Sequence, residues 1–69
     1  MRTKTQIKQL RRARQVSQEE LASAVGVSRQ TIISLENERY VASLPLAYKI
    51  ARYFGKSIEE VFDLSQWDD

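Results

Sequence analysis

The sequence predicts an all-α fold, a compact bundle of five helices in one domain spanning residues 1–69. Only two glycines and one proline interrupt the chain, and no run of strand length alternates between apolar and polar side chains. Serine residues suited to cap helices stand repeatedly before apolar residues with helical spacing. A chain of 69 residues is also far below the size of about 250 residues at which chains split into domains.

The first two helices are expected on either side of a short polar segment. One covers residues 5–14, and its inward face is marked at three-residue intervals by Ile7, Leu10 and Ala13. The next opens with a capping box, in which the Ser17 hydroxyl accepts from the Glu20 amide and the Glu20 carboxylate accepts from the Ser17 amide. Gly26 is a natural stop. The buried stripe of this second helix is predicted to be Leu21, Ala22, Ala24 and Val25.

A third helix follows with almost no connecting segment. Ser28 is suited to cap it, and Ile32 and Leu35 are expected to point inward. We expect its exit over residues 37–40, where Asn37 tolerates the left-handed conformation. Two short helices joined this tightly cannot lie antiparallel, so they cross steeply and expose the front of the second. The pattern predicts a helix-turn-helix over about residues 17–37.

Two further helices complete the bundle. Ser43 caps the fourth, Pro45 fits its first turn, and Gly55 ends it. A second capping box at residues 57–60 opens a short fifth helix that runs to Phe62, followed by a short tail over about 64–69. The apolar face of the fourth helix consists of Leu46, Ala47, Ile50, Ala51 and Phe54.

The composition argues against several classes of function. Cysteine and histidine are both absent, which removes disulfides, zinc fingers, thiol chemistry and the usual acid–base side chain. No apolar run approaches the roughly 20 residues of a membrane span, and the N-terminus does not resemble a signal peptide. No nucleophile–base pair is suggested, and a chain this short has little room for a cleft. We expect a cytoplasmic protein without enzymatic activity, metal or cofactor.

Charge is distributed unevenly although the net charge is only +2. Residues 1–16 hold six bases and no acid, and residues 57–69 hold five acids and no base. A basic end favours a polyanion partner, from which the acidic end would be turned away. Two solvated helix faces would produce the same pattern, so charge alone does not decide between them.

The outward face of the third helix carries chemistry that reads DNA bases. With Ile32 and Leu35 buried, helical spacing leaves outside Arg29, Gln30, Ile33, Ser34 and Asn37. Arginine bonds guanine and glutamine bonds adenine in the major groove, each discriminating by about 1–3 kcal/mol, and isoleucine can pack on a thymine methyl. The same residues could simply solvate a helix, but the tight turn, the caps and the adjacent basic helix agree on a major-groove reader.

A family resemblance rests on segments that cover roughly residues 5–63, namely 18–22, 25–32, 35–37, 43–44, 46–51 and 57–62. With these residues the chain resembles the phage-repressor (Cro/C1-type, XRE-like) helix-turn-helix transcriptional regulators. The resemblance implies the five-helix lambda repressor-like fold and sequence-specific binding of double-stranded DNA.

By position, the resemblance also implies individual roles. Arg11 would pair with Glu36 and brace the first helix against the third. Gln18 would bond a phosphate at the start of the second helix, where amides and the helix dipole favour an anion. Asn37 and Arg39 would contact the DNA backbone. Bases would be read by Arg29, Gln30 and Ser34, with Ser28 and Ile33 as further candidates.

The chain departs from the family pattern after the third helix. The family commonly has glycine where Glu38 stands, and a carboxylate there would repel phosphate unless it turns away. The usual Asn-Pro before the fourth helix is replaced by Val41-Ala42, which leaves the shape of that loop open.

Family members usually pair, which places two such helices about 34–36 Å apart on a pseudo-palindrome. The expected dimer surface consists of apolar residues that a small domain cannot easily hide: Tyr40, Val41, Leu44, Leu64 and Trp67. Trp67 could instead fold back on its own chain. We expect a homodimeric repressor that occludes a promoter and is controlled by its own concentration or by a partner.

Two alternative functions are compatible with the same fold. An antitoxin would bind its own promoter and also a toxin protein, and a small toxin-like reading frame beside the gene would reveal it. A protein-interaction adaptor would have kept the fold without binding DNA. Salt dependence separates the adaptor, because log K for duplex DNA falls with log salt by about 0.9 per phosphate contact.

Overall fold

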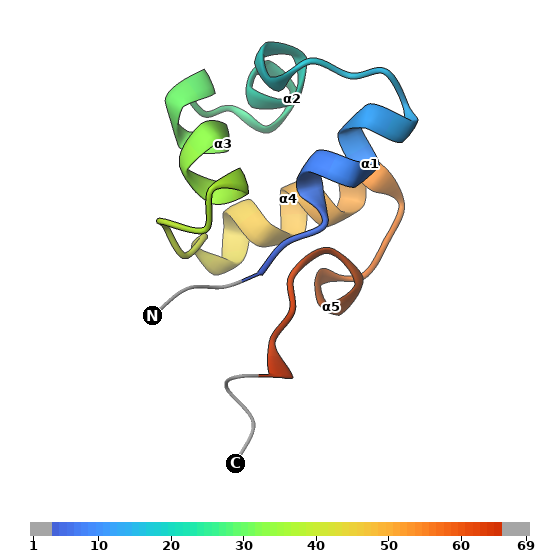
Figure 1. Ribbon diagram of the computed structural model, residues 1–69, viewed down its shortest axis with the longest axis vertical. Helices are drawn as coiled ribbons and strands as arrows, with labels where there is room; N and C mark the ends of the chain where they lie inside the picture. Colours follow the sequence, from blue (N-terminus) through green and yellow to red (C-terminus); the bar gives the residue numbers. More distant parts are fainter. Residues whose placement is uncertain (1–3, 66–69) are drawn as a thin grey trace.

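The computed structural model describes residues 4–65. This part of the chain contains five helices, as the sequence predicts. In Figure 1, α4 crosses the middle of the view, with α2 and α3 on one side of it and α5 on the other. Within residues 4–65, no helix is long and apolar enough to cross a membrane. The helices are α1 (Ile7–Ala13), α2 (Gln18–Val25), α3 (Arg29–Glu36), α4 (Leu44–Phe54) and α5 (Ile58–Val61).

Four of these helices begin at a serine whose hydroxyl accepts from the amide three residues later, as predicted. The caps are Ser17, Ser28, Ser43 and Ser57. In α2 and α5 the capping box is complete, because Glu20 and Glu60 also accept from the amide of their own capping serine. The starts of four helices therefore follow from hydrogen bonds that span only three residues.

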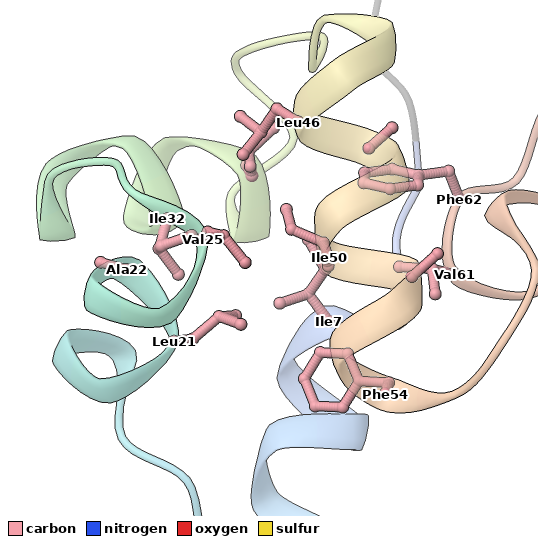
Figure 2. Packing of buried hydrophobic residues seen from close by; sticks show 13 residues of the cluster. Ile7, Leu21, Ala22, Val25, Ile32, Leu46, Ile50, Phe54, Val61 and Phe62 are labelled. Atoms are coloured by element: carbon pink, nitrogen blue, oxygen red, sulfur yellow. The ribbon is translucent and has the colours of Figure 1, made fainter.

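The hydrophobic core receives side chains from all five described helices and from Phe62 (Figure 2). Its fully buried members are Ile7, Leu21, Ile32, Leu35, Ile50, Phe54 and Val61. The predictions for Ala13 and Ala24 were wrong, since both are exposed. A helix turns about 100° per residue, so steps of three residues from Ile7 rotate Ala13 about 120° away from the core.

Four helix ends share a second device, a residue in the left-handed conformation just past the helix. After α3, the Glu38 amide donates to the Leu35 carbonyl at 3.0 Å and the Arg39 amide donates to the Ser34 carbonyl at 2.9 Å. This is the Schellman pattern. The prediction that Asn37 adopts the left-handed conformation was wrong, because Asn37 has φ −85°. The left-handed residues are Gln15 (φ 56°), Gly26 (φ 78°), Glu38 (φ 60°) and Gly55 (φ 66°).

The segment before α1 pairs with the segment after α5, which the sequence pattern did not indicate. Thr5 and Phe62 form an isolated antiparallel bridge. The Gln6 amide donates to the Val61 carbonyl and the Asp63 amide donates to the Lys4 carbonyl, both at 2.7 Å. This pairing corrects two boundaries: α1 begins at Ile7 instead of residue 5, and Phe62 is extended instead of helical.

The two left-handed residues that are not glycine predict a gain in stability. An L-residue in this conformation costs about 1–2 kcal/mol, and glycine loses about 0.5–1 kcal/mol more backbone entropy on folding. We expect Glu38→Gly and Gln15→Gly each to stabilise the protein by about 0.5–1 kcal/mol in urea unfolding. Glu38→Gln and Gln15→Ala keep the strained backbone and serve as controls, and an equal gain in the controls would contradict the explanation.

Candidate nucleic-acid interface

A three-residue turn joins α2 to α3 and sets the direction of α3. Gly26 adopts the left-handed conformation at the end of α2, and the Val27 amide donates to the Ala22 carbonyl at 3.0 Å. Ser28 then caps α3 at once. Ile32 and Leu35 are fully buried, so they anchor the inner side of α3 in the core. The opposite side of α3 is left free to face a partner.

The outer side of α3 brings together most of the predicted DNA-contacting residues. Arg29, Gln30 and Asn37 are exposed, and Ile33 and Ser34 are half-buried. Beside them lies a hollow of about 240 Å³, here called the α3 hollow. It is lined by Ser28, Gln30, Thr31, Ser34, Arg39 and Tyr40.

Tyr40 is placed differently from the other residues predicted for the dimer surface. Its side chain is 44% exposed and lines the α3 hollow together with Gln30 and Ser34. Sequence reasoning grouped it with the dimer surface because it is an apolar residue close to Val41. Its position directly after Arg39, on the loop that follows α3, could have indicated that Tyr40 lies beside the predicted DNA-contacting residues.

A second, larger hollow of about 550 Å³ lies at the beginning of α2 and is here called the basic hollow. Its lining includes four basic side chains and one acidic side chain: Lys8, Arg11, Arg12, Ser17, Gln18, Glu19 and Arg29. Lys8 and Arg12 are exposed. Sequence reasoning counted these two residues only as part of the net charge. Arg11 and Arg12 follow Lys8 by three and four residues on α1, and this spacing indicates a shared helix face.

The first turn of α2 also supplies backbone donors to the basic hollow. The first four amides of a helix have no intrahelical acceptor. In α2 the capping box satisfies the amides of Ser17 and Glu20. The amides of Gln18 and Glu19 remain as the two without an acceptor inside the helix, at the positive end of the helix dipole. Together with Lys8 and Arg12, they form an environment that favours an anion.

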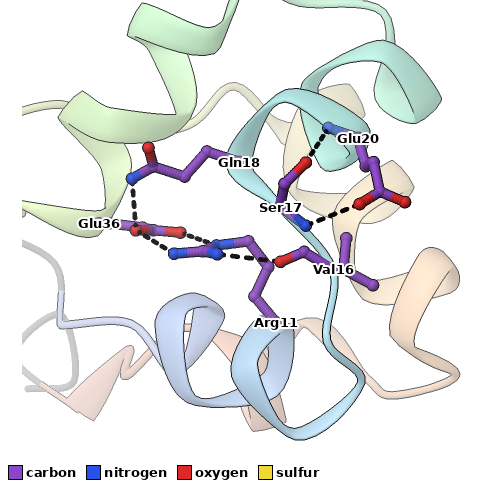
Figure 3. A network of polar contacts seen from close by, with 6 residues as sticks. All are labelled: Arg11, Val16, Ser17, Gln18, Glu20 and Glu36. Carbon is purple, nitrogen blue, oxygen red and sulfur yellow. Dashed lines mark hydrogen bonds and ion pairs between the residues drawn. The ribbon is translucent and has the colours of Figure 1, made fainter.

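Behind this hollow, the side chains of Arg11, Gln18 and Glu36 form one hydrogen-bonded cluster (Figure 3). Arg11 donates to both carboxylate oxygens of Glu36, from Nε at 2.6 Å and from Nη2 at 3.1 Å. Gln18 Nε2 donates to Glu36 Oε1 at 3.1 Å, and Arg11 Nη1 donates to the Val16 carbonyl at 2.9 Å. The predicted pairing of Arg11 with Glu36 is confirmed, and it joins α1, α2 and α3.

Glu36 is ionised in spite of its burial. Its side chain is only 4% exposed, and burial by itself would raise its pKa. The hydrogen bonds from Arg11 and Gln18, with the charges of Arg11 and Lys8, outweigh that effect and hold the pKa below its usual value. The same contact raises the pKa of Arg11 further. The pair is therefore fully charged near neutral pH.

Arg14, another base of the N-terminal segment, is also used inside the protein. It donates to the carbonyls of Tyr53 at 3.1 Å and Phe54 at 2.6 Å, at the end of α4. Its guanidinium also lies 5.4 Å from the centre of the Phe54 ring. With Arg11 engaged by Glu36, two of the five bases in residues 4–16 serve internal contacts, so this segment offers fewer charges to a polyanion than its sequence suggests.

Three of the residues predicted for the dimer surface lie together. Val41, Leu44 and Leu64 line an apolar hollow of about 200 Å³, here called the apolar groove. The rest of its lining is Ala42, Ala47, Ile58 and Phe62. Trp67 lies outside the described residues. Tyr48, which sequence reasoning did not single out, is also exposed, four residues after Leu44 on α4.

A capped α2, a three-residue turn and an α3 with a polar outer side define a helix-turn-helix protein. The model of a helix-turn-helix family matches residues 7–61, and the chain belongs to the Cro/C1-type helix-turn-helix family. It is a transcriptional regulator with a helix-turn-helix DNA-binding domain.

Individual relatives agree with this assignment. An uncharacterized HTH-type transcriptional regulator of Methanocaldococcus jannaschii is 49% identical over 59 residues, which cover 86% of this chain and 89% of the relative. Another from Archaeoglobus fulgidus is 52% identical over 59 residues, covering 86% and 83%. A crystal structure from Bacteroides fragilis superposes with a TM-score of 0.78 at 21% identity, covering 88% of this chain and 98% of that one. At that identity the structural likeness shows the fold alone.

The ionised state of Glu36 predicts a dependence of stability on pH. Because its pKa is lower in the folded protein than the usual 4.5, its contribution is complete above 4.5 and is lost as the pH falls through the folded value. We expect Glu36→Gln to cost roughly 3 kcal/mol at pH 7, because it leaves Arg11 without its charged partner. The variant should also lose less stability than the wild type between pH 5 and pH 3, a range over which carboxylates titrate.

Urea unfolding at several pH values measures both effects. The pKa values of Glu60 and Asp63 are also lowered, so some acid sensitivity remains in the variant. Glu60→Gln is the matched control, since it removes an exposed carboxylate of the second capping box. Parallel pH profiles for the wild type and Glu36→Gln would show that Glu36 is not the group responsible.

Proposed function

We propose that this protein is a repressor that binds a pseudo-palindromic operator as a homodimer and occludes a promoter. The observation that carries the proposal is the exposed leading edge of α3, Arg29 and Gln30, beside the basic hollow. A major groove about 12 Å wide admits one helix, and helix-turn-helix proteins enter it with the N-terminal residues of the second helix.

Base reading is assigned to the outer side of α3. Arg29 and Gln30 are the first two residues of the helix, so they extend furthest toward the floor of the groove. Ser34 lies one turn later, in the α3 hollow, and can bond to either base of a pair. Ser28 and the half-exposed Ile33 complete the candidates, the latter by contact with a thymine methyl.

Backbone contacts are assigned to two regions. At the beginning of α2, the Gln18 and Glu19 amides with Lys8 and Arg12 bind one phosphate region. The Gln18 side chain contributes less than expected, because its Nε2 already donates to Glu36. After the end of α3, Asn37 and Arg39 are exposed and contact the DNA backbone.

Tyr40 joins these backbone contacts on account of its place in the α3 hollow, where its phenol can donate to a phosphate. Glu38, a half-buried residue, lies on the same loop, and its carboxylate is an unfavourable charge for DNA there.

A dimer is proposed because one α3 of eight residues reads only a few base pairs. Beside the apolar groove, Leu44 and Tyr48 supply exposed apolar surface of the kind that marks an interaction site. Pairing two copies about a two-fold axis would set the two α3 helices one turn of DNA apart, about 34–36 Å.

Substitutions on α3 test base reading. We expect Arg29→Ala and Gln30→Ala each to cost about 1–3 kcal/mol of binding at particular base pairs and to relax the preference there, because a bidentate contact is lost. Selection of duplexes from a random pool followed by affinity measurements on single-base variants shows this. Lys49→Ala removes one positive charge from the exposed side of α4 and is the control for Arg29. If Arg29→Ala bound every duplex as the wild type does, α3 would not be the reader.

Substitutions in the basic hollow test the phosphate contact. We expect the double variant Lys8→Ala, Arg12→Ala to bind all duplexes more weakly, with an unchanged preference. Its slope of log K against log salt should be shallower by about 2 per protomer, or by about 0.9 for each lost contact. Lys49→Ala, Lys56→Ala removes the same charge elsewhere and should change the slope less. Equal slopes for the two double variants would contradict a phosphate contact in the basic hollow, because the salt dependence would then follow the total charge alone.

A further inference from the structure

The apolar groove lies between elements distant in sequence. Val41, Ala42 and Leu44 come from the segment that starts α4, Ile58 from α5, and Phe62 and Leu64 from the segment after α5. Every side chain that lines it is apolar. Leu44 is 74% exposed and Val41 is 46% exposed, so the rim of the groove presents apolar surface to solvent. Such a surface gains free energy when another apolar group covers it.

The chain itself continues from the edge of this groove. Leu64 belongs to the lining, and the Ser65 amide and hydroxyl both donate to Asp63 Oδ1, at 3.0 and 2.6 Å. Residues 66–69 follow and lie outside the described residues. They include Trp67, the only tryptophan of the chain. Trp67 is three residues after Leu64, and a single β-turn brings residues at this separation within about 7 Å of each other.

We propose that Trp67 docks in the apolar groove of its own chain. A tryptophan side chain can bury about 150–250 Å² of surface, and Trp67 follows the groove-lining Leu64 by only three residues. Docking within the chain is favoured over docking on a second copy, because a short tether gives the tail a high effective concentration at the groove. It also avoids the loss of translational freedom that association entails.

Charge complementarity supports the same placement. The groove borders the first turn of α4, the positive end of an eleven-residue helix. The first turns of α2 and α5 each contain two acidic residues, whereas the first turn of α4 contains none. Asp68 and Asp69 directly follow Trp67. With the indole in the groove, these carboxylates lie near the start of α4, where a negative charge is favourable.

This docking is independent of DNA binding and of pairing. It completes the apolar surface around Leu44 and holds the acidic end of the chain at the start of α4. The groove could therefore be filled in a protein that does not dimerise, and the test below is read without DNA.

The emission of Trp67 reports on its own surroundings, since no other tryptophan contributes. In the 69-residue protein we expect emission shifted to the blue of that in denaturant, and quenching by acrylamide reduced several-fold. Both should stay constant when the protein is diluted through the range in which dimers dissociate, as followed by sedimentation. Val41→Asp places a carboxylate in the groove and should restore the emission and the quenching of an exposed indole.

Tyr48→Asp is the matched control, because Tyr48 is exposed on α4 but does not line the groove. It should leave the emission as in the wild type. Leu44→Asp provides a second groove variant if far-UV circular dichroism shows that Val41→Asp is unfolded. The proposal is overturned by wild-type emission typical of a solvated indole, or by groove variants that leave the emission unchanged. A blue shift that disappears on dilution would also overturn it, because the tail would then dock on a second copy.

Discussion

The ion pair between Arg11 and Glu36 is the contact on which the orientation of α3 depends. Glu36 is the last residue of α3, where the helix dipole disfavours a carboxylate, and it is almost fully buried. Such a group is tolerated only when good geometry compensates its desolvation. Arg11 supplies a bidentate contact from α1, and Gln18 adds a third hydrogen bond from α2. The end of α3 is therefore held against two other helices, and a short rigid helix transmits that constraint to Arg29 and Gln30.

Four basic residues in and just after α1 divide into two groups with different roles. Arg11 and Arg14 satisfy a buried carboxylate and the last carbonyls of α4, respectively. Arginine suits both tasks because its planar guanidinium offers several donors in a fixed geometry. Lys8 and Arg12 remain exposed beside the start of α2. The same composition thus supports the fold and leaves positive charge on the face that we propose meets DNA.

The short connections between helices require left-handed backbone conformations, which the chain adopts at two glycines and at two residues with side chains. Each of these four helix ends has a left-handed residue, and glycine supplies it at Gly26 and Gly55 without strain. Gln15 and Glu38 supply it with a side chain present. Glu38 stands next to the proposed backbone contacts of Asn37 and Arg39, so the strained position and an unfavourable charge for DNA coincide in one residue.

The sequence alone determined the starts of the four serine-capped helices, the turn between α2 and α3, and the identity of the exposed edge of α3. Those features follow from hydrogen bonds and side-chain periodicity within a few residues, as in the capping box at Ser17. The tertiary structure decided which bases stay free, that Tyr40 lies in the α3 hollow, and that Thr5 pairs with Phe62. These depend on contacts between segments far apart in the chain, whose energies no local pattern records. Ala13 and Ala24 are exposed, because a helix buries only the side that its neighbours cover.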